Sequence, residues 1–223
     1  MKTIHAQVVE DPSLYNLQAF LMFGIAVAGK SADSVSEKIQ MFLANLENGY
    51  GPGLPFDLIR NLLKKNEGCL NSHVPYWTDA IKALKGEMQL VKLGQYTKLV
   101  RAFGYLALTP LDLTTCTVEQ LEAIPGCGPK TARYFLMYTR PNFKGAALDT
   151  HILKYLSGPC GLEGIPSSTP PKGAKYNAIE EQFLKIANLL EVEPKELDNA
   201  VWQWYSRGVP LPAGLIGADY GSF

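Results

Sequence analysis

The sequence lacks the features of a membrane or secreted protein. No apolar run reaches about 18 residues, the length that a membrane-spanning helix needs. The first residues, Met1-Lys2-Thr3-Ile4-His5, do not have the pattern of a secretory signal peptide. We therefore expect a soluble, cytoplasmic protein with no membrane partner.

Cysteine is scarce and scattered. The chain has four cysteines, Cys69, Cys116, Cys127 and Cys160, with no CxxC pair and no other metal-ligand spacing. Scattered thiols are typical of proteins from a reducing compartment. The sequence accordingly predicts no metal and no other cofactor.

An excess of either charge is also absent. The 21 lysine and arginine residues balance the 21 aspartate and glutamate residues, which by itself argues against a strongly basic nucleic-acid binder. The distribution is uneven, however. Residues 57–105 and 127–155 each carry a net charge of +4, whereas residues 176–207 carry −3. This asymmetry is consistent with one basic face directed at phosphate groups, and solvated helix surfaces are the alternative explanation.

No strand pattern and no internal repeat is present, and apolar residues recur at helical spacing. Helices are predicted over residues 17–28, 35–46, 56–65, 84–93, 98–106, 176–190 and 194–205. Residues 165–173 are predicted to form a linker or an ordered surface loop, and residues 208–223 an extended tail. With 223 residues the chain is long enough to bury a substantial core. The expected fold class is all-α.

A glycine-rich turn between two helical stretches is the most informative local pattern. Thr117 followed by Gln120 has the spacing of a capping box and predicts the start of a helix. Residues 125–129, Pro-Gly-Cys-Gly-Pro, cannot continue that helix, and Pro129 suits the first turn of a second one. Glycines without side chains let a phosphate approach backbone amides at a helix start. A tight turn with no ligand is the alternative interpretation.

Two ionisable residues follow the turn. Lys130 lies in the first turn of the second helix. Asp149 follows a short apolar approach, Ala146-Ala147-Leu148, and is placed to cap a third helix that begins at Thr150. Taken alone, Lys130 is readily explained as a solvated charge and Asp149 as a structural cap worth about 1 kcal/mol.

Together these patterns resemble the helix-hairpin-helix–Gly/Pro/Asp superfamily of DNA glycosylases. The residues that fit its L-x-x-[IL]-P-G-x-G-x-K-T-A signature are Leu121, Pro125, Gly126, Gly128, Lys130, Thr131 and Ala132. Residues 148–152, Leu-Asp-Thr-His-Ile, fit its [VL]-D-T-H-[IV] signature. Residues 93–99 are similar to a G-x-Y-x-x-K-A segment of endonuclease III relatives, and residues 27–33 to their S-A-Q-A-T-D segment, with Lys30 in place of glutamine. The similarity covers about residues 18–156.

The resemblance implies a chemistry for Lys130 and Asp149. Enzymes that act on a base take it out of the stack and read it in a pocket. In bifunctional members of the superfamily, the lysine attacks the sugar, expels the base and forms a Schiff base that permits β-elimination of the 3′ phosphate. The aspartate stabilises positive charge on the sugar and holds the amine. Because monofunctional members lack the lysine, Lys130 implies glycosylase plus AP lyase activity.

The resemblance also implies an architecture and a partner. It predicts two helical lobes flanking a DNA-binding cleft, with a helix-hairpin-helix motif at about residues 117–136 at their junction. Residues 1–32 with 131–207 would form the terminal lobe, and residues 33–130 the central lobe. The partner would be double-stranded DNA containing a damaged or modified base, bound by a monomer wherever that DNA lies, in a cell the nucleoid. The four closely spaced cysteines that hold an iron–sulphur cluster in endonuclease III relatives are missing.

Further candidate site residues surround this pair. DNA contacts are predicted for Gly126, Cys127, Gly128, Lys98, Thr131, His151 and Lys30. For His151, packing beside a helix start is the preferred alternative. Trp202, Tyr205 and Asp198 on the last helix are predicted to form the base pocket, since stacking of an aromatic ring on a base contributes roughly 1–3 kcal/mol. Packing of these rings on the core is the alternative, and it is preferred for Trp204.

The motifs do not name the base. The lysine-bearing, cluster-free pattern is most similar to the 8-oxoguanine glycosylase/lyase branch, with oxidised pyrimidines as the alternative substrates. Two other hypotheses keep the fold and change the function. One is a relative that transfers a group onto a modified thymine in viral DNA, and the other is a non-catalytic DNA-binding module in which Lys130 contacts phosphate.

Overall fold

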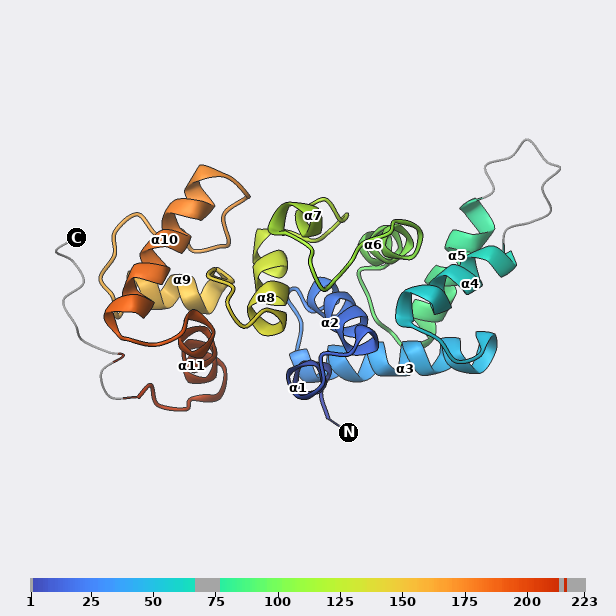
Figure 1. Cartoon of the computed structure of the whole chain (residues 1–223), viewed down its shortest axis with the longest axis horizontal. Coiled ribbons are helices and arrows are strands. Elements are labelled where there is room, and N and C mark those ends of the chain that lie inside the picture. Colours follow the sequence, from blue (N-terminus) through green and yellow to red (C-terminus); the bar gives the residue numbers. More distant parts are fainter. Residues whose placement is uncertain (1, 67–76, 213–214, 216–223) are drawn as a thin grey trace. The chain divides into compact units, whose positions relative to one another are not determined.

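The computed structural model describes residues 2–66, 77–212 and 215. Cys69 and most of the predicted tail lie outside these residues. The described residues form eleven α-helices and no strand, which confirms the all-α prediction (Figure 1). In chain order the helices are α1 (Ile4–Glu10), α2 (Leu14–Ala26), α3 (Ala32–Tyr50), α4 (Pro55–Asn66), α5 (Trp77–Leu90), α6 (Tyr96–Leu108), α7 (Val118–Glu122), α8 (Pro129–Thr139), α9 (Thr150–Ser157), α10 (Ala174–Leu189) and α11 (Pro194–Arg207).

Local sequence explains where several helices begin. The predicted capping box of α7 is confirmed: Gln120 N donates to Thr117 Oγ1 (3.3 Å), and Thr117 N donates to Gln120 Oε1 (2.9 Å). Pro129 is in the first turn of α8, as predicted, where its missing amide costs no helical hydrogen bond. Helix α1 was not predicted; it begins after a Thr3 cap.

The chain divides into two compact units, residues 1–127 and 128–223. The boundary lies inside the glycine turn. Residues 1–32 belong to the first unit, whereas the sequence-based division groups them with residues 131–207. That grouping of the terminal segments stays a prediction.

Helix α2 is the central element of the first unit. It contacts α1, α3, α4 and α6, and every residue from Leu17 to Ala26 is buried. A helix that is apolar on all sides needs packing partners on all sides. Gln18, the polar exception, accepts a hydrogen bond at Oε1 from Phe56 N (2.9 Å), which ties α2 to the start of α4.

The second unit is built on one apolar cluster shared by α9, α10 and α11. Its fully buried members include Tyr155, Tyr176 and Phe183. Leu211 and Leu215, from the segment predicted to be an extended tail, pack into the same cluster. Helix α8 contacts α11, and α11 contacts α9. The cluster positions α9 and α11, and the contact with α11 positions α8, which carries Lys130.

Candidate functional site

Lys130 lies in the first turn of α8. Gly128 is the N-cap, and its backbone is extended (φ −87°, ψ 177°). The Lys130 side chain is half-buried, and its Nζ lies 5.3 Å from the centroid of the Tyr134 ring. The ring of Tyr138 follows, with its centroid 5.1 Å from that of Tyr134. Because residues four apart lie on the same side of a helix, the lysine and the two tyrosines share one face of α8.

Asp149 caps α9, as predicted. Its Oδ1 accepts hydrogen bonds from the amides of His151 (2.8 Å) and Ile152 (2.9 Å). Both bonds fall on Oδ1, and capping therefore does not use the second oxygen of the carboxylate. The structural role of Asp149 is compatible with a chemical one.

The carboxyl group of Asp198 is buried on α11, with 8% of the residue exposed. It accepts a hydrogen bond from the Tyr138 hydroxyl. Burial, followed by the negative charge of Asp149, raises the pKa of Asp198 from 3.8 to about 7, while Lys130 and the Tyr138 hydrogen bond act in the opposite direction. The structure thus brings Lys130, Asp149 and Asp198 within electrostatic reach of one another in the second unit.

Tyr138 remains a hydrogen-bond donor at neutral pH. Burial, and secondly the carboxylate of Asp198, raises the pKa of its hydroxyl above the ordinary value of 10.0. The ammonium of Lys195 lies 5.4 Å from the centroid of the Tyr138 ring. The hydroxyl is therefore held between α8 and α11 in the form that can orient the Asp198 carboxylate.

The aromatic residues at the end of α11 are in part packed. Tyr205 stacks on His151, with ring centroids 5.6 Å apart and an interplanar angle of 8°. Trp204 and Tyr205 pack against the apolar cluster of the second unit. Trp202 is half-buried, and the Arg207 guanidinium lies 5.3 Å from its ring centroid. Contacts of Trp202 and Tyr205 with a base, and of His151 with phosphate, stay predictions.

The turn between α7 and α8 has one position that requires glycine. Gly126 has a φ of +80°, and a Cβ there would lie 2.9 Å from Cγ and Cε of Lys98. A Cβ on Gly128 would meet no described atom within 4 Å. Cys127 N donates to Ile124 O (3.0 Å), and burial of its thiol raises the pKa to about 12. The predicted contacts of these three turn residues with DNA therefore concern their backbone.

The two lysines of the first unit that were predicted to contact DNA bind backbone carbonyls. Lys98 Nζ donates to Ile25 O (2.8 Å) near the end of α2, and Lys30 Nζ donates to Leu93 O (2.6 Å). Lysine at a helix C-terminus stabilises the carbonyls that have no helical partner. An ammonium group has three donors, so phosphate contact by either lysine stays a prediction. Thr131, another predicted DNA contact, is 8% exposed.

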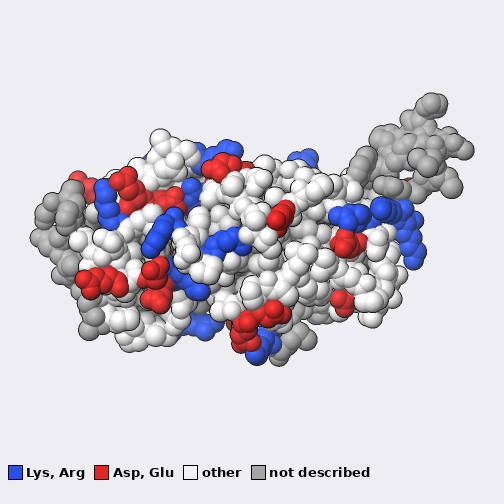
Figure 2. All heavy atoms as spheres, in the orientation of Figure 1, with Lys and Arg blue, Asp and Glu red and all other residues white. Residues whose placement is uncertain are grey.

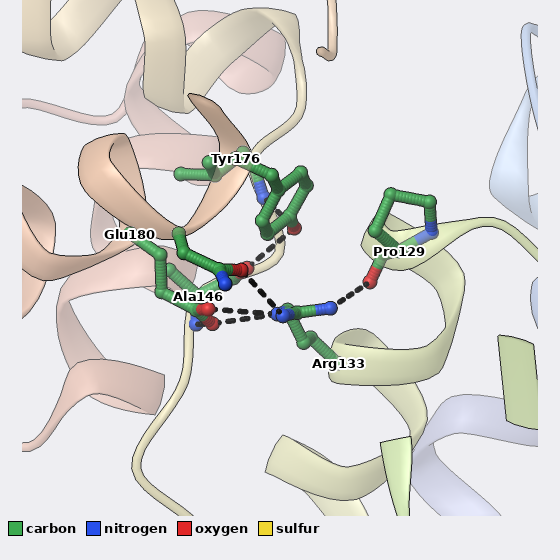
Figure 3. A network of polar contacts seen from close by, with 7 residues as sticks. Pro129, Arg133, Ala146, Tyr176 and Glu180 are labelled. Atoms are coloured by element: carbon green, nitrogen blue, oxygen red, sulfur yellow. Dashed lines mark hydrogen bonds and ion pairs between the residues drawn. The ribbon is translucent and has the colours of Figure 1, made fainter. Parts of the chain in front are cut away.

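No sequence pattern predicted the polar network that joins α8 and α10 near the segment before Asp149. Arg133 on α8 donates from Nε to Oε1 (2.7 Å) and Oε2 (2.9 Å) of Glu180 on α10, beside Tyr176 (Figure 3). Arg133 and Glu180 are 47 residues apart, and no local pattern pairs them. Tyr134 and Tyr138 were also missed, although their spacing of four and eight residues from Lys130 was a signal that could have found them.

Two features, a metal site and a membrane-spanning helix, are not found among the described residues. No group of three or more His, Cys, Asp or Glu residues in 2–66, 77–212 and 215 is arranged to hold a metal ion. No helix within those ranges is long and apolar enough to cross a membrane. Figure 2 shows basic and acidic side chains interspersed on the surface that it draws.

Comparisons with protein-family models, with curated proteins and with solved structures find no match to this chain. Its function is therefore inferred from its residues and their geometry. Within the described part of the chain, the group formed by Lys130, Asp149 and Asp198 has the most specific chemistry.

Proposed function

We propose that the protein is a DNA glycosylase with AP lyase activity, of the helix-hairpin-helix–Gly/Pro/Asp type. Its substrate is an oxidised base in DNA, and 8-oxoguanine is the first candidate. The observation that carries this proposal is that Lys130 and Asp149 both lie within electrostatic reach of the buried carboxyl of Asp198. An amine and two carboxyl groups from three parts of the second unit are placed together. A turn that serves only to connect two helices does not require such a group.

Lys130 is the nucleophile of this reaction. Its amine forms a bond to C1′ of the everted nucleotide as the glycosidic bond breaks, and the bonding electron pair leaves with the base, which then takes up a proton. The carboxylate of Asp149 stabilises the positive charge that develops on the sugar. Loss of a proton from the amine and opening of the sugar ring give a Schiff base. Removal of a C2′ proton then expels the 3′ phosphate.

Asp198 is suited to move the proton of Lys130. An amine is nucleophilic only after it has lost its proton, and a carboxyl group with a pKa near 7 exchanges protons readily at neutral pH. The Asp198 carboxylate accepts this proton while the Tyr138 hydroxyl orients it. Asp198 would move this proton in addition to its predicted part in the base pocket. Both roles require its carboxyl group to lie close to Lys130.

DNA docking is proposed from the resemblance. The glycine turn would be the hairpin of a helix-hairpin-helix motif, and its backbone would approach a phosphate of double-stranded DNA. Two helical lobes would flank the DNA-binding cleft of a monomer. Gly126 supports this docking, because it is exposed and has a left-handed backbone, and it carries no side chain of its own that would cover the turn.

Borohydride trapping tests the proposal. The protein is incubated with duplexes that carry a single 8-oxoguanine, oxidised pyrimidine or modified thymine, and borohydride then reduces any Schiff base to a stable adduct. Wild type and Lys175→Gln, a control at an exposed lysine of α10, should form the adduct with the 8-oxoguanine duplex, and Lys130→Gln should not. Asp149→Asn should lose base release.

The other outcomes identify the alternatives. Release of free base without an adduct would show a monofunctional glycosylase and remove the nucleophilic role of Lys130. DNA binding without free base and without an adduct would exclude base excision as the reaction. A further assay with modified-thymine DNA and an amine donor would then separate a group-transfer enzyme from a DNA-binding module.

A further inference from the structure

Side chains of α10 hold the three buried residues that precede Asp149. Glu180 Oε1 accepts a hydrogen bond from Ala146 N (2.8 Å). The Tyr176 hydroxyl donates to Ala146 O (2.7 Å) and accepts from Leu148 N (3.1 Å). This segment is outside any helix, and its buried backbone groups need partners. Thr169 Oγ1 also donates to Leu148 O (2.7 Å), so that Tyr176 and Glu180 determine the path of the segment together with Thr169.

The same two residues of α10 also hold α8. Arg133 bonds to both carboxylate oxygens of Glu180, and its guanidinium lies 4.4 Å from the centroid of the Tyr176 ring (Figure 3). Arg133 lies one turn after Lys130, and its Nη1 donates to Pro129 O (3.4 Å). The side chains of Arg133 and Glu180 are only 10% and 13% exposed. Water therefore screens this pair weakly.

Gly145 allows the segment to run close to α10. A Cβ at this position would lie 2.4 Å from Cε1 of Phe143 and 3.0 Å from Oε1 of Glu180. A side chain there would have to displace the Phe143 ring and would press on the Glu180 carboxylate. The absence of a side chain at position 145 is therefore part of the geometry that lets Glu180 reach Ala146 N.

We infer that Tyr176 and Glu180 are positioning residues that fix the placement of Asp149 relative to Lys130. The catalytic consequence of this inference rests on the proposed function. Each of the two residues contacts both the helix that carries Lys130 and the segment that ends at Asp149. A displacement of about 1 Å between reacting groups lowers a rate on the order of 10²-fold.

Tyr176→Phe is the variant that tests the inference, because it removes the hydroxyl and keeps the ring beside Arg133. Tyr155→Phe is the matched control. Both tyrosines are fully buried in the second unit, and the Tyr155 hydroxyl donates to the backbone of Leu215 (3.0 Å), which is not part of the segment before Asp149. Amide hydrogen exchange of residues 146–152 and the single-turnover rate of base release are measured on each folded protein. Unfolding in urea reports the stability that each variant loses.

We expect Tyr176→Phe to speed exchange in residues 146–152 and to lower the single-turnover rate about 10-fold or more, with an unchanged Kd for DNA. Tyr155→Phe should do neither, even where it loses as much stability. Gly145→Ala leaves the hydroxyl in place and should reproduce the slow rate, which keeps the test valid if Tyr176→Phe does not fold.

Two results would overturn the inference. One is unchanged exchange in residues 146–152, and the other is a wild-type rate in Tyr176→Phe or, if that variant does not fold, in Gly145→Ala. Failure of the proposed function is distinguishable, since wild type itself would then release no base and form no adduct. That result would remove the catalytic role of the two residues, whereas faster exchange in the variant would still establish that they hold Asp149.

Discussion

Replacing Asp198 with asparagine should change how the stability of the second unit depends on pH. In the folded protein, burial and then Asp149 raise the pKa of Asp198 from 3.8 to about 7. The folded state therefore binds this proton more tightly than the unfolded chain does. The contribution of Asp198 to the free energy of unfolding is fully present below about pH 4, falls as the pH rises toward 7, and is lost above it.

The expected effect is large. A difference of about 3 pKa units at about 1.4 kcal/mol each corresponds to about 4 kcal/mol, against a typical total stability of about 5–15 kcal/mol. Asparagine cannot ionise and can still accept the hydrogen bond from Tyr138. The stability of Asp198→Asn relative to wild type should therefore rise by about 3 kcal/mol between pH 5 and pH 8.

Urea unfolding at both pH values measures this difference. Two of the three tryptophans, Trp202 and Trp204, lie on α11, and so fluorescence reports mainly on the second unit. Glu163→Gln, at an exposed carboxylate of the same unit, is the control and should follow wild type. Equal pH dependence in wild type and Asp198→Asn would refute the inferred environment of Asp198.

Further predictions concern the turn and its cap. Gly126→Ala should lower the free energy of unfolding by about 1 kcal/mol or more, because the backbone is left-handed and the new methyl group would press on Lys98. Gly104→Ala, within α6 and with no described atom near its Cβ, should instead raise it by about 0.5–1 kcal/mol; urea unfolding with the same sign for both would contradict this reasoning. Thr117→Ala should cost about 1 kcal/mol, and an unchanged value would argue against the capping box as a source of stability. Because all three positions lie in the first unit, urea unfolding of these variants is followed by circular dichroism of the helices.

The helices could largely be predicted because their signals are local. Helices α4, α10 and α11 agree with the predicted ranges 56–65, 176–190 and 194–205 to within about two residues. Caps at Thr117 and Asp149 were readable from neighbouring residues. Helix α1 was missed because it is short and buries only two of its residues.

The surroundings of the site could not be read in this way, because they depend on contacts between distant segments. Arg133 was counted with the basic residues of a possible DNA-binding face, yet it is 8% exposed and paired with Glu180. Asp198 was assigned to a base pocket from its place on the last helix. Its closeness to Lys130 and Asp149 follows only from the packing of α11 against α8 and α9.

The central claim is that Lys130 is the nucleophile. The most direct measurement is proteolytic digestion and mass spectrometry of the borohydride-reduced complex formed with an 8-oxoguanine duplex. The proposed function predicts a reduced sugar remnant on Lys130 and on no other lysine. A remnant on a different amine, or complete base release with no modified lysine, would contradict it.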